Sequence, residues 1–186
     1  HEQATRARLA EKLPDVYVSL SSEVLPHIKE YERVSTTAVN AYVGPVLERY
    51  LSQLETRLRD AGYSGPALIT LSHGGVTPIV EAIRMAAGTV LSGPAGGLAG
   101  ARHASDMLDV GQMITFDMGG TSSDISLIVD GEATLSADRS VAGEKIALSS
   151  LDIITLGAGG GSIAWANSGG LLEVGPHSAG AVPGDR

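Results

Sequence analysis

The run MITFDMGGTSSD at residues 113–124 constrains the fold of this chain more than any other stretch. It has an apolar segment that ends in Asp117, then Gly119 and Gly120, and then hydroxyl side chains. Because glycine has no Cβ, its backbone can approach an anion closely and turn amide hydrogens toward it. This order of residues is typical of a hairpin whose loop binds phosphate.

Polar side chains on both sides of the two glycines fit the same chemistry. Thr121 and Ser122 add hydroxyl donors. Asp117 is placed to hold a hard cation, which magnesium chemistry favours through water. Asp124 is a second carboxylate and a candidate general base. The run therefore predicts a site for a nucleotide with Mg²⁺, with Asp117 as its metal residue.

The same composition also suits an ordinary tight turn between two strands. Residues 114–116 predict a buried strand before the turn, and residues 124–129 predict an alternating strand after it. The dipeptide Asp130-Gly131 predicts a further hairpin. A Walker loop is excluded, since it requires a following helix and a lysine, and neither Gly-Lys-Ser nor Gly-Lys-Thr occurs in the chain.

A second glycine cluster lies at residues 158–162, between two apolar runs. Its glycines are Gly159, Gly160 and Gly161. Composition alone favours a flexible turn that joins two strands, since turns account for most glycine clusters. A second ligand-binding loop is the alternative.

Five stretches resemble the hydantoinase A and 5-oxoprolinase family. The run FDMGGTSSD is similar to the second phosphate loop of that family. Other stretches agree in the same order along the chain: EYERVSTTAVNAYVGPVLERYL (residues 30–51), VLSGPAGG (90–97), GAGGGSIAW (157–165) and VGPHSAGAVPG (174–184). Together they cover nearly all of the chain and are far more specific than one glycine loop.

The resemblance implies an α/β fold, namely a ribonuclease-H-like lobe of the actin, sugar kinase and Hsp70 ATPase superfamily with a mixed sheet and flanking helices. It implies ATP and Mg²⁺ as cofactors and ATP-dependent opening of a cyclic amide such as a hydantoin or 5-oxoproline. It also gives a ligand role for Gly159, Gly160 and Gly161 equal standing with a simple turn. His73 departs from the asparagine expected in many members, and a hydrogen-bonding role for it is favoured over catalysis.

Two other functions remain open. A subunit of an acetone or acetophenone carboxylase would carry the same loops, and a non-catalytic nucleotide-binding or assembly module is the third possibility. The family's first phosphate loop has no counterpart here, because no second Gly-Gly-Thr occurs. We therefore expect an internal piece with little turnover alone, which works in an oligomer with a further lobe or a partner subunit.

Residues 1–186 are interpreted as a single domain in which residues 1–62 are mainly helical and residues 63–186 form an α/β nucleotide-binding lobe. Helices are predicted at residues 2–12 and 35–61, the latter kinked or divided at Pro45. A further short helix is predicted with Ser21 or Ser22 as its N-cap.

Strands are predicted at residues 16–20, 67–71 and 90–92. A helix is predicted to begin with Thr77 as cap and Pro78 in its first position, and another to open with Gly93-Pro94. This βα order predicts one or two parallel strands beside an antiparallel hairpin.

Composition narrows the class of partner. The net charge is −8 without a basic run, which argues against a nucleic acid. The chain has no cysteine, so disulfides and thiolate catalysis are excluded. No apolar stretch is long enough to span a bilayer, so we expect a cytoplasmic protein without a membrane partner. The small-molecule substrate that the family resemblance implies is a cyclic amide.

Overall fold

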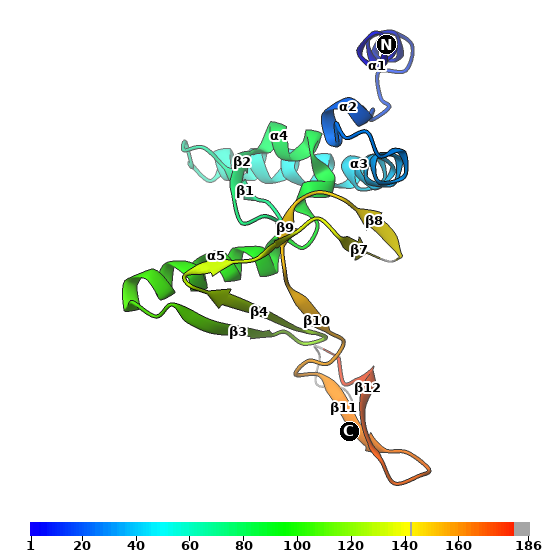
Figure 1. Ribbon diagram of the computed structural model, residues 1–186. Coiled ribbons are helices and arrows are strands. Elements are labelled where there is room, and N and C mark those ends of the chain that lie inside the picture. Colours follow the sequence, from blue (N-terminus) through cyan, green and yellow to red (C-terminus); the bar gives the residue numbers. More distant parts are fainter. Residues whose placement is uncertain (142, 181–186) are drawn as a thin grey trace. The chain divides into compact units, whose positions relative to one another are not determined.

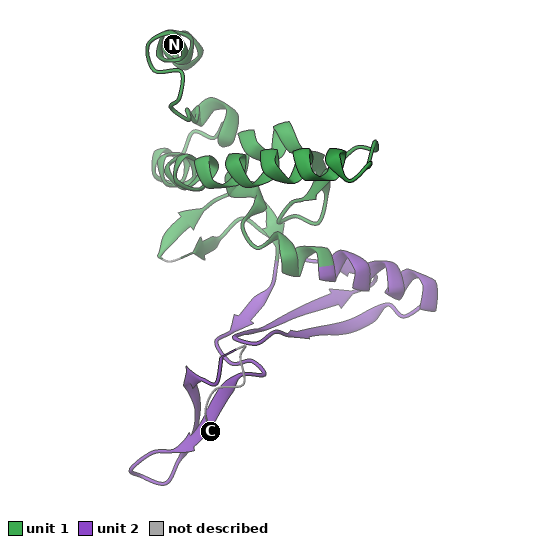
Figure 2. Cartoon of the chain, turned by 180° about the vertical axis from the view of Figure 1, so that it is seen from behind, with its two compact units in different colours: residues 1–96, 135–151 green, residues 97–134, 152–186 purple. Residues whose placement is uncertain are grey.

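The structure is a computed structural model that describes residues 1–141 and 143–180. The chain divides into two compact units (Figure 2). The first contains residues 1–96 and 135–151, and the second contains residues 97–134 and the described residues from 152 onward. These units cut across the division expected at residue 62, because residues 135–151 return to the helical segment. No helix in the described ranges is long and apolar enough to cross a membrane.

Helices dominate the first unit (Figure 1). They are α1 (Glu2–Lys12), α2 (Ser21–Val24), α3 (Glu30–Asp60), α4 (Ile79–Arg84) and the 3-10 helix η1 (Ala86–Thr89). The helix predicted at residues 2–12 is confirmed. Helix α3 begins earlier than predicted and contains Pro45 within one continuous element. Gly62, with a φ of 86°, follows its C-cap in the left-handed region that glycine favours.

The serines expected to cap α2 have another role. The N-cap of α2 is Leu20, and no side chain caps this helix. Instead, the hydroxyl groups of Ser21 and Ser22 donate hydrogen bonds of 2.5 and 2.7 Å to the carboxylate of Glu2. The Ser22 amide donates to the same carboxylate at 2.9 Å. The serines therefore join α2 to α1 by hydrogen bonds and do not cap α2.

The strands of the first unit form short antiparallel pairs: β1 (Leu68–Thr70) with β2 (Val76–Pro78), β6 (Leu135–Ser136) with β9 (Ser150–Leu151), and β7 (Arg139–Val141) with β8 (Glu144–Ile146). Strand β1 confirms the strand predicted at residues 67–71. The predicted cap at Thr77 is wrong, because Thr77 pairs with Ile69 in the β1–β2 ladder and α4 begins only at Ile79.

Two other predicted strands do not form. Residues 16–20 have no strand pairing, and the Tyr17 and Ser19 side chains bond to the α3 side chain of Asn40 instead. Residues 90 and 91 connect η1 to α5 (Ser92–Leu108), and Ser92 is the first residue of that helix. The helix predicted to open with Gly93-Pro94 is confirmed, one residue early.

In the first unit, α3 contributes to an apolar core and also carries a stripe of buried polar and small residues. Leu51, Ile79 and Ala82 form the apolar cluster, and further apolar side chains pack against it: Leu47, Leu54, Ala67, Ile69 and Ile83. Thr36, Asn40 and Gly44, spaced four residues apart, form a stripe of buried small and polar residues.

Asn40, in this stripe, is fully buried, and both ends of its side-chain amide form hydrogen bonds. Its Nδ2 donates to Tyr17 Oη at 3.2 Å, Ser19 Oγ at 2.9 Å and the Arg84 carbonyl at 3.1 Å. Its Oδ1 accepts from the Ala87 amide at 2.9 Å. One α3 side chain thus bonds to η1, to α4 and to the segment of residues 13–20 between α1 and α2.

The second unit is built on a four-stranded sheet: β3 (Gln112–Met118), β4 (Ser123–Val129), β5 (Glu132–Ala133) and β10 (Ile154–Leu156). Strand β4 lies between β3 and β10, and β5 pairs with the end of β4. Asp130 and Gly131, with φ values of 52° and 76°, form the predicted turn. A separate antiparallel hairpin follows, with β11 (Ser162–Ala166) and β12 (Leu172–Ser178).

The fold is mixed α/β, but the expected parallel strands are absent: every strand pair in the described ranges is antiparallel. Short turns join β3 and β5 to β4, which makes these pairs antiparallel, and β10 pairs with β4 in the antiparallel direction after a longer connection. The prediction that residues 114–116 are buried is also wrong, since Ile114 is 71% and Phe116 58% exposed.

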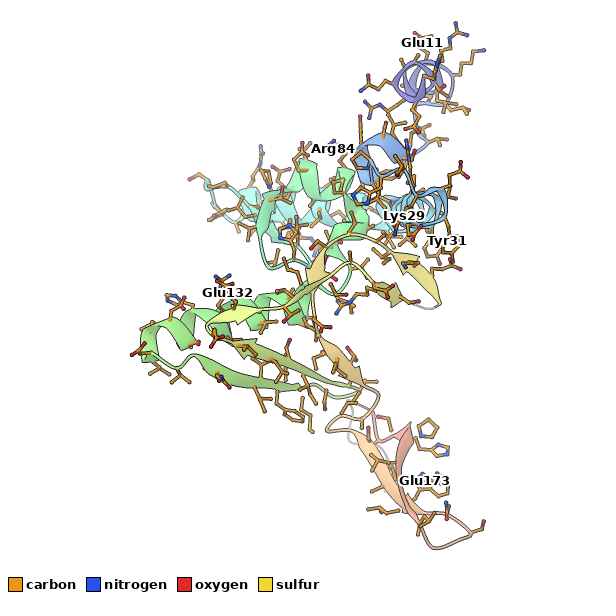
Figure 3. The ribbon with its side chains drawn as sticks, viewed as in Figure 1. Glu11, Lys29, Tyr31, Arg84, Glu132 and Glu173 are labelled. Carbon is orange, nitrogen blue, oxygen red and sulfur yellow. The ribbon has the colours of Figure 1, made fainter. Side chains whose placement is uncertain are left out.

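Within the second unit, α5 runs along the β3–β4 hairpin (Figure 1). Arg102 of α5 donates a 2.7 Å hydrogen bond to Glu132, which Figure 3 labels. Ser126 and Ile128 of β4 are buried, whereas Leu127 and Val129, on its opposite face, are exposed. One face of the sheet is therefore buried at β4, and the opposite face, which carries apolar side chains, is exposed to solvent.

Candidate functional site

Strand pairing places the two predicted carboxylates opposite each other. Asp117 of β3 and Asp124 of β4 are direct Cα partners in the antiparallel ladder. Residues opposite each other in such a ladder project to the same face of the sheet. The two side chains therefore stand side by side at the base of the loop of residues 119–122.

This loop closes with few internal hydrogen bonds. The Gly119 amide donates to the Ser122 carbonyl at 2.9 Å. Among the described residues, the amides of Gly120, Thr121 and Ser122 have no acceptor. Gly120 and Thr121 are also exposed. A loop with unpaired, accessible amide groups has the donors that an anion requires.

The structure brings the second glycine cluster onto this loop. The Gly160 amide donates to the Gly119 carbonyl at 2.9 Å, and the Gly161 amide donates to the Gly120 carbonyl at 2.8 Å. Ser123 at the start of β4 donates through Oγ to the Ala158 carbonyl at 2.7 Å. The two clusters that the sequence analysis treated separately therefore form one structure within the second unit, where β4, β10 and β11 meet (Figure 1).

The two loops lie so close together that positions 159 and 161 require glycine. A Cβ added to Gly159 would lie 2.7 Å from the Gly119 carbonyl oxygen and 2.8 Å from the amide nitrogens of Thr121 and Ser122. A Cβ on Gly161 would lie 2.9 Å from the Gly120 carbonyl oxygen. Distances this short are not sustained by real Cβ atoms, so backbone atoms would have to move.

Thr155, which no sequence motif singles out, extends the carboxylate pair across a third strand. Thr155 of β10 is the Cα partner of Asp124 and donates through Oγ1 to Asp124 Oδ1 at 2.5 Å. Only the register of β10 against β4 reveals this contact. No described residue donates a hydrogen bond to the carboxylate of Asp117, which is exposed and therefore accessible to a cation.

The carboxylates do not form a complete metal cage by themselves. The described residues contain no group of three or more histidine, aspartate or glutamate side chains arranged to hold an ion. Magnesium usually retains several waters and takes one or two carboxylates together with phosphate oxygens. The position of Asp117 beside a loop with unpaired amide groups is compatible with that mode of binding.

His73 belongs to the first unit, whereas the loop of residues 119–122 belongs to the second. Its Nδ1 accepts a 3.2 Å hydrogen bond from the Gly75 amide, which holds the β1–β2 turn. The favoured hydrogen-bonding role of this histidine is therefore confirmed. A Cβ on Gly75 would lie 2.5 Å from the ring, so the glycine allows the imidazole to fold over the turn.

Comparison with known proteins identifies the family. Residues 33–185 match the family described as Hydantoinase/oxoprolinase, and the chain belongs to it. The chain is 41% identical to the caprolactamase subunit alpha of Pseudomonas jessenii, over 99% of this chain and 26% of that protein. It is 38% identical to the 5-oxoprolinase of Saccharomyces cerevisiae, over 99% of this chain and 14% of that protein.

Two solved structures have the same fold. The ATP-dependent caprolactamase from Pseudomonas jessenii aligns with a TM-score of 0.82 over 99% of this chain and 27% of that chain. A nucleotide-free acetone carboxylase, studied for ATP-dependent acetone carboxylation, aligns with a TM-score of 0.77 and 28% identity over 96% of this chain and 25% of that one. The chain spans about a quarter or less of the length of these proteins.

Proposed function

We propose that this chain supplies the phosphate-binding loop of an ATP-dependent enzyme that opens a cyclic amide ring. One observation carries the proposal: the exposed amides of Gly120 and Thr121 have no acceptor among the described residues. The names of the relatives support it, since they describe a caprolactamase and a 5-oxoprolinase. The superfamily expected from the sequence, a ribonuclease-H-like lobe, belongs to the same proposal.

Each residue of the loop has a distinct role in this proposal. The amides of Gly120 and Thr121 and the hydroxyl groups of Thr121 and Ser122 hold phosphate oxygens. Asp117 holds Mg²⁺ through water, because its carboxylate is exposed beside the loop. Asp124, whose Oδ1 is occupied by Thr155, orients water or substrate as the second carboxylate. When bound, ATP provides a terminal phosphoryl group that activates the amide oxygen of the ring.

The whole enzyme needs more polypeptide than this chain. The caprolactamase relative is a subunit alpha, and this chain covers 26% of it. We propose that a further lobe or a partner subunit completes the site and supplies the pocket for the ring, in an oligomer. The chain alone is then expected to have little or no turnover.

The likeness to acetone carboxylase favours a second candidate, in which ATP activates a ketone or bicarbonate. One assay separates the candidates. The full-length protein with its partner subunits is incubated with ATP, Mg²⁺ and either a panel of cyclic amides or acetone with bicarbonate. Mass spectrometry then follows nucleotide and organic products. ATP consumption that requires a cyclic amide and yields its ring-opened acid supports the first proposal.

The other outcomes are equally clear. Consumption of ATP that requires ketone and bicarbonate would replace the hydrolase with a carboxylase. Binding of a non-hydrolysable ATP analogue without turnover on either panel would indicate a non-catalytic nucleotide-binding module. Absence of analogue binding by the full-length protein would contradict the phosphate-loop assignment itself.

A further inference from the structure

The geometry points to a bracing role for the second glycine cluster: residues 158–162 orient two peptide groups of the phosphate loop and do not contact the phosphate. We call this segment the glycine brace. The inference rests on the proposed function of the loop of residues 119–122. It replaces the ligand role that the family resemblance left open for Gly159, Gly160 and Gly161.

The amides of Gly159, Gly160 and Gly161 in the brace already donate hydrogen bonds within the protein. Gly159 donates to Ser162 Oγ at 2.9 Å. Gly160 and Gly161 donate to the carbonyl oxygens of Gly119 and Gly120 at 2.9 and 2.8 Å. A backbone amide provides a single donor, so none of these three groups is free to bind an anion.

The same hydrogen bonds determine where the loop amides point. In a planar trans peptide, the carbonyl oxygen and the amide hydrogen project in opposite directions. With the Gly119 carbonyl held toward the brace, the amide of Gly120 in that peptide points away from it. The Gly120 carbonyl fixes the Thr121 amide in the same way. The two hydrogen bonds thereby turn two unpaired amide hydrogens away from the amides of Gly160 and Gly161, to where an incoming phosphate would meet them.

Packing keeps the brace in register with the loop. The position of a Cβ on Gly159 is already surrounded by the Gly119 oxygen and the nitrogens of Thr121 and Ser122, all within 2.8 Å. On the far side, the Ala179 amide donates to the Gly161 carbonyl at 2.8 Å. The brace is therefore held between the phosphate loop and the end of β12, and a side chain on Gly159 would separate it from the loop.

The test compares Gly159→Ala with Gly157→Ala in the full-length enzyme. Gly157 has no atom within 4 Å of its Cβ position and no positive φ, so it is a control close to the brace. Hydrogen exchange without nucleotide reports the brace directly. We expect the amides of Gly160 and Gly161 to exchange faster in Gly159→Ala and to remain unchanged in Gly157→Ala.

Binding assays report the consequence for phosphate. The affinity for a non-hydrolysable ATP analogue with Mg²⁺ should fall about tenfold or more in Gly159→Ala, because misdirected amides lose charge-assisted hydrogen bonds. The affinity for adenosine, which has no phosphate, should not change. An unchanged exchange rate with weaker analogue binding would mean that Gly159 contacts the ligand, and it would overturn the inference. An equal loss for adenosine would also overturn it.

A second variant covers the case in which Gly159→Ala does not fold. Ser123→Ala removes the hydroxyl bonded to the Ala158 carbonyl and adds no atom. Faster exchange at Gly160 and Gly161 in this variant supports the brace, and unchanged exchange contradicts it. If the unmodified enzyme binds no nucleotide, the proposed function fails, while the exchange rates still decide whether residues 158–162 hold the loop.

Discussion

The Gly160 amide nitrogen lies 2.9 Å from the Gly119 carbonyl oxygen, in a hydrogen bond between two glycine loops that are far apart in the sequence. Because β10 pairs with β4, the segment that follows β10 returns to the turn between β3 and β4. A loop with few internal bonds thus gains a fixed conformation from a neighbouring loop.

Asp117→Ala should weaken the Mg²⁺-dependent binding of an ATP analogue by about tenfold or more, since the carboxylate proposed to hold the hydrated ion is lost. The measurement is a titration of the full-length protein with and without Mg²⁺. In the unmodified protein, removing Mg²⁺ with EDTA should have a similar effect, and in the variant it should add little. Equal Mg²⁺ dependence in both proteins would rule out Asp117 as the metal residue.

If the proposed ring opening is the reaction, Thr155→Val should reduce its kcat/KM by about tenfold, because it removes the hydrogen bond that holds the Asp124 carboxylate. Valine keeps the shape and the strand preference of threonine. Thr155→Ser retains the hydroxyl and should preserve most of the activity. Equal losses in Thr155→Val and Thr155→Ser would indicate a packing effect instead of a hydrogen bond.

Asn40→Ala should destabilise the first unit by about 3 kcal/mol or more, because it leaves several buried polar groups without partners. Urea unfolding followed by circular dichroism measures the change. Gln53→Ala, at an exposed position on the same helix, is the matched control and should change stability by less than about 0.5 kcal/mol.

Gly44→Ala and Gly97→Ala should have effects of opposite sign, although both glycines lie inside helices. A Cβ on Gly44 would lie 2.2 Å from Cζ of Tyr17, whose hydroxyl donates to the Ile83 carbonyl at 2.5 Å. We expect a net loss of about 1–2 kcal/mol, since the clash exceeds the gain in helix propensity.

Gly97 in α5 has open space around its Cβ position. Alanine there should stabilise the protein by up to about 1 kcal/mol. The two free energies of unfolding come from the same urea titration. Stabilisation by both substitutions would show that the Tyr17 ring moves aside without cost.

Glu2 should make the junction of α1 with α2 sensitive to acid. Hydrogen bonds from Ser21 and Ser22, with a smaller contribution from Arg33, lower the pKa of Glu2 from 4.5 to about 2. A lowered pKa in the folded state means that the stabilising effect is complete above pH 4.5 and is lost as the pH falls toward 2. Hydrogen exchange of the Ser22 amide should therefore show more frequent opening across this window.

Glu2→Gln provides the control for that titration. The amide side chain has no charge to titrate, so the pH dependence of opening at Ser22 between 4.5 and 2 should disappear. A junction that opens with the same pH dependence in the variant would assign the effect to another carboxylate.

Local patterns in the sequence predicted the elements that depend on near neighbours. The helix at residues 2–12 and the Asp130-Gly131 turn were predicted correctly, because periodic spacing and turn chemistry act within a few residues. The strand predicted at residues 90–92 failed, since three residues rich in β-branched or small side chains form a strand only when a partner strand is available. The same reason explains the missing strand at residues 16–20.

The sequence by itself determined the family and the glycine hairpin and indicated which loop residues are candidates to bind phosphate, because these depend on residue types at short, fixed spacings. Only the tertiary structure decided that Asp117 faces Asp124, that Thr155 bonds to Asp124, and that residues 158–162 hold the loop. These contacts join segments that are distant in the chain. They arise from strand register and backbone hydrogen bonding, which leave no periodic signal in the order of the residues.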